Sequence, residues 1–270
     1  MKSMHWSLVV IILMCTHELF AQKDELNFKV SNAVSPDVNL EDSIFYTMED
    51  AIKAPLRVRQ LNLESKHLKV LPSAVLTFTN LQALDISHNR ISNLPDSLFI
   101  ACLKLEELRY EGNDLTEIPS SVYRSSLKLL DLSENHITVV PDQIGECKRL
   151  EELDMHANDI TMLPTKHVIL HHLKSLILSD NPLIKTGEWM FHQPRLQILF
   201  LDDTQLQQLD DSFCKATNLR LLNIEGNALK KLPDCVCHLK GLRIMMLGGN
   251  QFESTMQDEL LKCLPHLLVR

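Results

Sequence analysis

Aliphatic residues recur along this chain with a period of about 23 residues. The pattern Leu-x-x-Leu-x-Leu-x-x-Asn occurs in nine copies, and successive copies are 22 to 24 residues apart. The second apolar positions of the copies are Leu61, Leu84, Leu108, Leu130, Leu153, Leu176, Leu199, Leu222 and Met245. A period of this length, held over most of a chain, indicates a stack of short structural units.

The centre of each copy alternates apolar and polar residues, which predicts a short β-strand. Successive side chains of a strand face opposite sides, so Leu61 and Leu63 are expected to point into the interior and Asn62 outwards. Most copies continue with an asparagine, whose amide can satisfy backbone groups where the chain turns into a dry interior. Thr204 replaces this asparagine in the seventh copy, so we expect fewer hydrogen bonds there.

These motifs resemble the leucine-rich-repeat family, in particular its class of about 23 residues in which Leu-Pro follows the asparagine, as in Ras-group and bacterial members. The resemblance covers roughly residues 56–255. It implies an α/β solenoid, with a curved parallel sheet on the concave face and short helices and turns on the convex face. One repeat cannot offset the entropy of ordering its own backbone, so such units are stable only in arrays. The sixth copy departs from the pattern at 184–189, where we expect an altered convex segment and a convex tryptophan, Trp189.

The segments that flank the repeats predict an export signal and two caps. Residues 1–21 combine Lys2, an apolar run of about ten residues and a small residue, Ala21, which is the layout of a secretory signal peptide. The apolar run is too short for a membrane span. Residues 22–40 are expected to form a linker. The protein is therefore expected to be secreted, periplasmic or on the cell surface; it would be cytoplasmic if residues 1–21 are retained.

Residues 41–55 predict a helical N-terminal cap, with Thr47 and Asp50 as a capping box and Pro55 ending the helix. Residues 256–270 predict a C-terminal capping helix. Its apolar residues Leu260, Leu261 and Leu264 are expected to face the ninth repeat.

Composition argues against nucleic acid and against catalysis. The net charge is -8, whereas nucleic-acid surfaces need clustered Lys and Arg. Phosphate-binding, nucleophile-elbow and zinc-protease motifs are absent. His167, His171 and His172 have no acidic or thiol ligand close in sequence, so we expect a solvated convex surface there. We expect no catalytic residue, no cofactor and no metal.

Six cysteines follow residue 21. Cys147 falls on a repeated apolar position and is expected to pack in the interior as a small hydrophobe, and Cys102 lies beside the equivalent position in the third repeat. Cys214 and Cys237 are one repeat apart, at 23 residues, and are the expected disulfide pair in an oxidising compartment. The sequence suggests no pairing for Cys235 and Cys263.

The outward-facing strand positions form the candidate binding surface, and they divide into two halves. Repeats two to five present charged residues: Asp85, Glu107, Arg109, Glu111, Asp131, Glu152, Asp154 and His156. Repeats six to nine present apolar residues: Ile177, Ile198, Phe200, Leu221, Ile244 and Met246. Exposed apolar clusters commonly mark contact surfaces, so these six are expected to be solvent-exposed and to anchor a partner, with Phe200 at their centre.

This division predicts a protein or peptide ligand that is extended and partly basic, steered by the acidic half. Two alternatives remain at this stage. One is a structural or adhesive protein of the cell surface; the other is an intracellular signalling scaffold, if the N-terminus is not cleaved.

Overall fold

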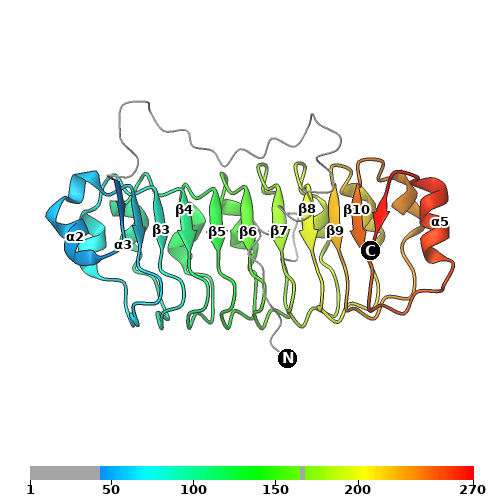
Figure 1. The fold of residues 1–270 in the computed structure, drawn as a ribbon, viewed down its shortest axis with the longest axis horizontal. Helices are drawn as coiled ribbons and strands as arrows, with labels where there is room; N and C mark the ends of the chain where they lie inside the picture. The colour runs from blue at the N-terminus through cyan, green and yellow to red at the C-terminus, as the bar shows by residue number, and fades with distance from the viewer. Residues whose placement is uncertain (1–42, 165–167) are drawn as a thin grey trace. The chain divides into compact units, whose positions relative to one another are not determined.

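A computed structural model of the chain describes residues 43–164 and 168–270. The expected signal peptide, the expected linker and His167 lie outside these ranges. The described residues form a parallel sheet of eleven strands whose spatial order equals their order in the chain (Figure 1). The strands are β1 (Ile44–Phe45), β2 (Gln60–Asn62), β3 (Ala83–Asp85), β4 (Glu107–Arg109), β5 (Leu129–Asp131), β6 (Glu152–Asp154), β7 (Ser175–Ile177), β8 (Ile198–Phe200), β9 (Leu221–Asn223), β10 (Ile244–Met246) and β11 (Leu268–Val269).

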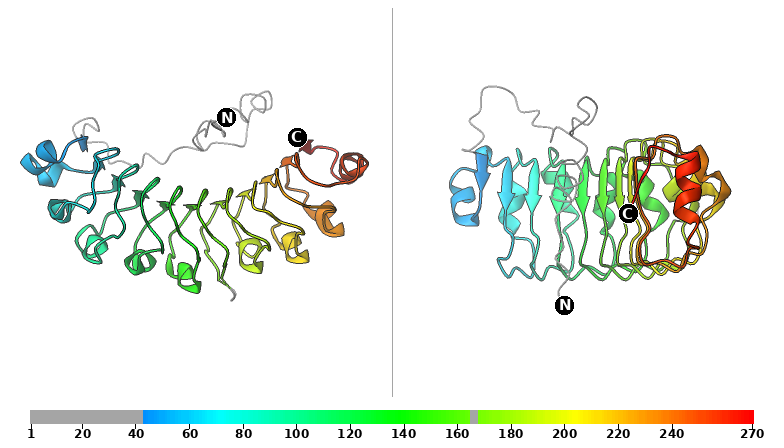
Figure 2. Two further views of the ribbon diagram at one scale, coloured as in Figure 1. Left: turned by 90° about the horizontal axis from the view of Figure 1, so that it is seen from below. Right: turned by 45° about the vertical axis from the view of Figure 1, so that its right-hand side comes forward.

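Strands β2 to β10 are the centres of the nine sequence repeats. Short helices connect them: the α-helices are α2 (Met48–Lys53), α3 (Ser97–Ala101), α4 (Glu188–Phe191) and α5 (Met256–Cys263). The 3-10 helices are η2 (Pro55–Arg57), η3 (Ser73–Thr77), η4 (Ser120–Arg124), η5 (Asp142–Glu146), η6 (Asp211–Lys215) and η7 (Asp234–His238). Figure 2 (left) shows the strands lining the concave side and the helices of the repeats on the convex side. The predicted α/β solenoid is thus confirmed.

Stacked aliphatic side chains fill the space between the sheet and the convex segments. Leu130, in β5, and Leu132, just after that strand, are fully buried. The corresponding residues of the other repeats continue the same layers. Each repeat covers its neighbours, which is why the core runs without interruption through the array. Tyr110 also occupies a core position, and its hydroxyl donates to Ile91 O at 2.8 Å.

The recurring asparagines form a hydrogen-bonded ladder at the point where each strand ends. In the fourth repeat, Asn135 Nδ2 donates to Tyr110 O (2.9 Å), Leu132 O (3.1 Å) and Ser133 O (2.9 Å). Its Oδ1 accepts from Leu115 N at 2.9 Å. The amide therefore joins two repeats and satisfies buried backbone groups that no strand partner reaches.

Thr204 makes fewer of these contacts, as the sequence predicted. Its hydroxyl lies 2.8 Å from Leu201 O and 3.0 Å from Asn227 Oδ1, and it does not reach the preceding repeat. Leu183 N, which an asparagine at position 204 would satisfy, instead donates to Asn181 O at 2.7 Å. A local turn thus replaces the bond between repeats.

The sixth repeat has the altered convex segment that its sequence indicated. Thr186 and Gly187 stand where other repeats have Leu-Pro, and helix α4 follows them. Gln193 Oε1 accepts from Leu170 N (2.7 Å) while its Nε2 donates to Val168 O (2.9 Å). The expectation of an exposed Trp189 was wrong, because Trp189 is 1% exposed and packs in the core. A Cβ at Gly187 would lie 2.7 Å from Trp189 Cδ1, so the ring occupies space beside the glycine that stands in place of proline.

Both ends of the solenoid are capped. At the N-terminal end the Thr47 side chain accepts from Asp50 N, and helix α2 ends at Lys53, before Pro55. At the C-terminal end Leu260 and Leu264 are buried against the core and Leu261 is partly buried. The C-terminal helix is shorter than expected: α5 ends at Cys263, and the chain returns to the sheet as β11, paired with β10.

The expected disulfide was wrong: Cys214 does not pair with Cys237. Cys214 pairs with Cys235 (Cα–Cα 5.9 Å), and Cys237 pairs with Cys263 (Cα–Cα 5.4 Å). Cys235 and Cys237 are two residues apart on η7, where a turn contains three residues, so their side chains point in different directions. One therefore reaches the preceding repeat, and the other reaches α5. Cys102 and Cys147 are buried free thiols, and the interior position expected for Cys147 is confirmed.

Candidate functional site: the concave face

Strand register arranges the outward-facing residues into columns that run across the sheet. Asp85 pairs with Arg109, Arg109 with Asp131, and Asp131 with Asp154. The same column continues through Ile177, Phe200 and Asn223 to Met246. A second column contains Glu107, Leu129, Glu152, Ser175, Ile198, Leu221 and Ile244. The structure therefore brings the residues of the predicted surface together in the predicted order.

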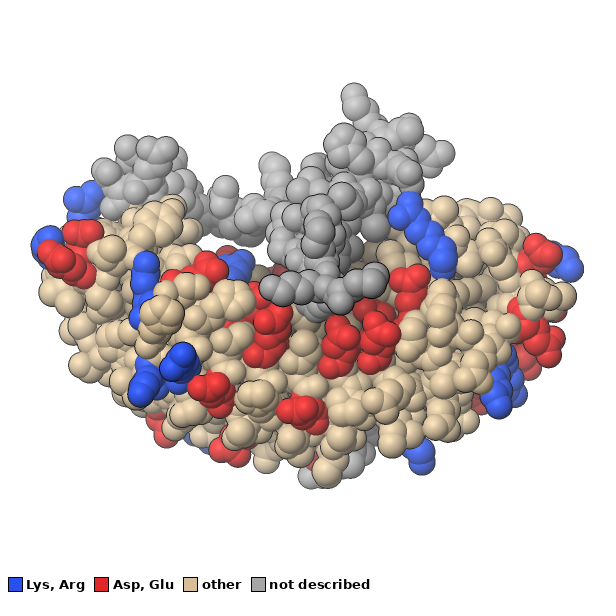
Figure 3. Space-filling model, turned by 60° about the horizontal axis from the view of Figure 1, so that its bottom comes forward, with Lys and Arg blue, Asp and Glu red and all other residues tan. Residues whose placement is uncertain are grey.

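Carboxylates dominate the half of this face formed by β3 to β6. Figure 3 shows Asp and Glu side chains gathered over the central part of the molecule. Three of the aspartates also hold the turns that follow the strands: Asp85, Asp131 and Asp154 each accept a hydrogen bond from the backbone N two residues further on, at 3.0 Å. These side chains are therefore fixed by the backbone and cannot rotate away from the face.

Two cations offset this charge in part. Arg109 Nη1 lies 3.4 Å from Glu107 Oε2, and His156 Nδ1 lies 2.9 Å from Asp154 Oδ1. Burial is the largest influence on the pKa of His156 and lowers it, but the hydrogen bond with Asp154 and the charges of Asp154, Asp131 and Glu111 together raise that pKa to about 9. His156 is therefore an imidazolium at neutral pH.

The remaining carboxylates are poorly compensated. Burial raises the pKa of Asp131 to about 6, and the charge of Asp154 adds to the shift against hydrogen bonds from Ser133 that lower it. Burial also raises the pKa values of Glu111 and Glu152. The charges of neighbouring carboxylates contribute to these shifts, and a cationic group from outside would relieve that repulsion.

The apolar half differs from the expectation. Ile177, Phe200, Leu221 and Ile244 were expected to be exposed, yet each is only 5–8% exposed. They are nevertheless absent from the continuous hydrophobic core. They form a separate layer on the concave side, in neighbouring positions of the two columns. Ile198 and Met246 keep intermediate exposure.

The structure also assembles one group that the sequence did not reveal. Ligand atoms of His88, Glu111 and Glu134, from three successive repeats, lie within 4.8 Å of one another. His88 and Glu134 occupy the turn position next to the columns considered above. The equal turn positions of His88 and Glu134 could have been recognised from the sequence. Their closeness to Glu111 could not, because it depends on the direction of the side chains.

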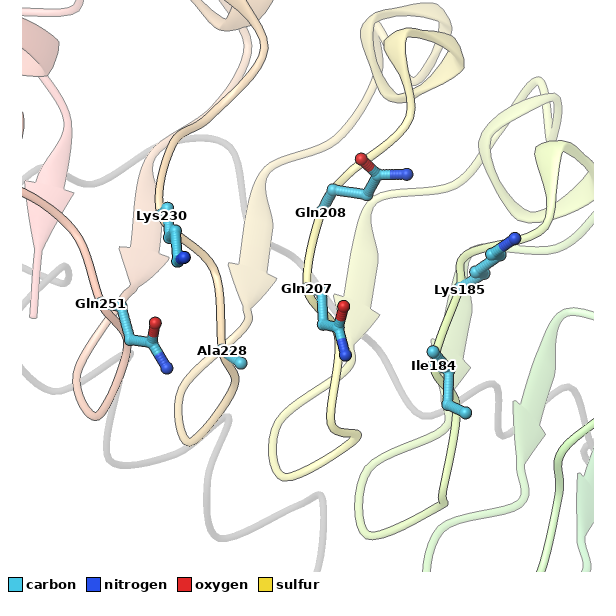
Figure 4. Close-up of a pocket in the computed structure, with 7 residues that line it drawn as sticks. All are labelled: Ile184, Lys185, Gln207, Gln208, Ala228, Lys230 and Gln251. Atoms are coloured by element: carbon cyan, nitrogen blue, oxygen red, sulfur yellow. The ribbon is translucent and has the colours of Figure 1, made fainter.

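A polar groove of about 450 Å³ lies beside the loops that follow β7 to β10 (Figure 4). Lys185, Lys230, Gln207, Gln208 and Gln251 line it together with two aliphatic side chains. The lining contains no carboxylate, imidazole or thiol. The groove therefore lacks the paired acid and base, and the activated nucleophile, that most hydrolytic and transfer reactions need.

Comparison with known proteins agrees with the geometry. Two repeat models, both described as leucine rich repeat, match residues 103–160, 125–183 and 194–252, and residues 80–101. The chain belongs to the leucine-rich-repeat family. This repeat fold is usually non-catalytic, and the family is generally protein-binding. Within the part of the chain that the structure describes, none of the helices has the length and hydrophobicity needed to cross a membrane.

Among characterised relatives, the chain is 33% identical over 97 residues to the volume-regulated anion channel subunit LRRC8E of Xenopus laevis, a match over 35% of this chain and 12% of the subunit. It is 29% identical over 147 residues to Toll-like receptor 2 of Mus musculus, over 54% of this chain and 18% of the receptor. The chain thus spans a small part of the relatives it matches.

Two bacterial structures share the fold. A leucine-rich-repeat protein of Leptospira interrogans has a TM-score of 0.63 at 22% identity, covering 80% of this chain and 62% of that one. An internalin of Listeria monocytogenes has a TM-score of 0.60 at 15% identity, covering 83% of this chain and 70% of that one. Another solved structure with this fold comes from a complex of latrophilin 3, Unc5D and FLRT2. It has a TM-score of 0.58 at 24% identity, covering 80% of this chain and 76% of that one.

Proposed function

We propose that this protein is a non-catalytic binding module whose concave face holds a protein or peptide partner with cationic side chains. The observation that carries the proposal is the row of carboxylates on β3 to β6, with the raised pKa values of Asp131, Glu111 and Glu152. This half of the face contains six carboxylates but only the Arg109 guanidinium and the His156 imidazolium to balance them. Lys or Arg side chains from a partner would neutralise the excess negative charge.

The scaffold suits such a role. The carboxylates lie on strands fixed by parallel pairing on both sides, so binding requires little ordering of this surface. Long-range attraction from the acidic half would accelerate encounter with a cationic partner, and salt would weaken it. Leu129 within this field, and Ile198 and Met246 further along the sheet, keep intermediate exposure and are apolar contacts available to a partner.

Affinity capture from the native source tests this proposal, with the intact chain and two charge variants. One variant carries Glu107→Gln and Glu152→Gln on the concave strands. The matched control carries Glu117→Gln and Glu146→Gln, which remove the same charge from exposed positions outside these strands. We expect a partner that the intact chain and the control retain and the concave variant loses, with affinity falling as salt rises. Equal retention by both variants would reject the concave face.

We further propose that the protein is exported. Two disulfides among the described residues support this, because disulfides persist in oxidising compartments. The layout of residues 1–21 supports it as well. Mass spectrometry of the N-terminal peptide of the native protein is the test. A mature start near Gln22 is expected, whereas a retained Met1 would favour a cytoplasmic scaffold.

A further inference from the structure

We infer that His88, Glu111 and Glu134 form a binding site for a single divalent transition-metal ion of the zinc type at the edge of the concave face. One side chain comes from each of the second, third and fourth repeats. Their ligand atoms already lie within 4.8 Å of one another, and His88 Nε2 is 3.7 Å from Glu111 Oε1.

The backbone fixes where these three side chains begin. His88, Gly112 and Glu134 occupy the same turn position in successive repeats, and each has a positive φ of 54°, 63° and 51°. Hydrogen bonds from His88 N to Glu111 O (2.7 Å), from Gly112 N to Ser133 O (3.0 Å) and from Glu134 N to His156 O (2.9 Å) tie each turn to the next repeat. The site therefore rests on a rigid frame.

Gly112 makes the cluster possible. It stands between His88 and Glu134, and a Cβ at this position would lie only 2.5 Å from His88 Nδ1. The imidazole therefore lies over the glycine, in space that any other residue would fill. Without this gap, His88 would be separated from the carboxylates of the third and fourth repeats.

The ligand set indicates the type of ion. Zinc binds imidazole nitrogen and carboxylate oxygen at about 2.0–2.2 Å, which places neighbouring ligand atoms about 3–3.5 Å apart. The observed spacing is wider, at 3.7 Å between His88 Nε2 and Glu111 Oε1 and within 4.8 Å for the whole group. His88 and Glu134 are exposed, so rotation of their side chains can bring the ligand atoms closer. Calcium and magnesium prefer oxygen ligands alone and are not expected to compete.

Electrostatics favour a cation at this position. Two of the three ligand side chains are carboxylates, which carry negative charge when ionised. A metal held by three protein ligands would keep an open coordination position, which water or a partner side chain can occupy.

Calorimetric titration of the untagged full chain, freed of metal by a chelator, tests the site with Zn²⁺ alone and with Ca²⁺ alone. We expect one equivalent of Zn²⁺ to bind, and His88→Ala or Glu134→Gln to weaken binding at least tenfold. The matched control is His136→Ala: His136 is also exposed (64% of its side chain, against 42% for His88) and lies 3.5 Å from Asp159, but it is outside the cluster.

Circular dichroism without metal shows whether each variant is folded, and Co²⁺ absorption of the intact chain reports imidazole coordination independently of any variant. Absence of Zn²⁺ binding by the intact chain would overturn the inference. So would unchanged Zn²⁺ binding by His88→Ala, an equal loss in His136→Ala, or Ca²⁺ binding as tight as Zn²⁺ binding.

Discussion

The asparagine ladder gives the most direct test of how this solenoid is held together, and Asn135→Ala is the perturbation. Asn135 is 4% exposed, and its amide makes four hydrogen bonds to backbone groups. After the change, Leu132 O keeps Asn158 Nδ2 at 3.0 Å and Ser133 O keeps Gly112 N at 3.0 Å. Leu115 N loses its acceptor inside the protein.

The expected cost follows from these contacts. One buried donor without a partner costs about 1–3 kcal/mol, and the three weakened carbonyls add about 0.5–1 kcal/mol each. The variant should therefore lose about 4 kcal/mol of unfolding free energy, which corresponds to a melting temperature roughly 8–16 °C lower for a domain of this size. Thermal and urea unfolding followed by circular dichroism measures both quantities.

Two further variants make the result specific. Asn93→Ala removes the same side chain from an exposed position and should change stability by less than about 0.5 kcal/mol. Asn135→Thr copies the seventh repeat, where Thr204 bonds mainly within its own turn, and should recover part of the loss. A loss below about 1 kcal/mol for Asn135→Ala, or equal losses for Asn93→Ala and Asn135→Ala, would refute the role given to the ladder.

The remaining predictions concern charge, face and crosslink. Because the pKa of Asp131 is raised to about 6 in the fold, its ionisation destabilises the fold as pH rises through about 4 to 6. Asp131→Asn should therefore raise the unfolding free energy by up to about 2 kcal/mol at pH 7.5 and leave it unchanged near pH 3.5. An effect of the same size at both pH values would contradict the raised pKa of Asp131. Leu199→Asp places a charge in the core and should unfold the chain, whereas Phe200→Asp, in the separate concave layer, should leave it folded with a lower melting temperature. Equal unfolding of these two variants would mean that the concave layer is part of the core. Cys237→Ser removes the crosslink to Cys263, which spans 26 residues, and should lower the unfolding free energy by about 3 kcal/mol. Amide exchange should increase in α5 first, whereas a uniform increase along the chain would argue against a local role of this disulfide.

Sequence alone determined the repeating features of this protein. The 23-residue period fixes which side chains enter the core, because a strand alternates its faces and stacked units share one register. The nine strands, the asparagine turns, the capping contact of Thr47 and the buried Cys147 all depend on residues close together in the chain or at equal repeat positions. For the same reason the weaker turn at Thr204 could be predicted from a single substitution.

Tertiary structure decided what depends on the surroundings and the direction of individual side chains. Ile177 and Phe200 are buried, although their strand positions face away from the continuous core. The turn of η7 points Cys235 and Cys237 in different directions, so they pair with different cysteines. The grouping of His88 with Glu111 and Glu134 depends on the space left above one glycine. Equal spacing along the chain establishes which column a residue joins, but distances between side chains of neighbouring repeats are set only when the units stack and bend.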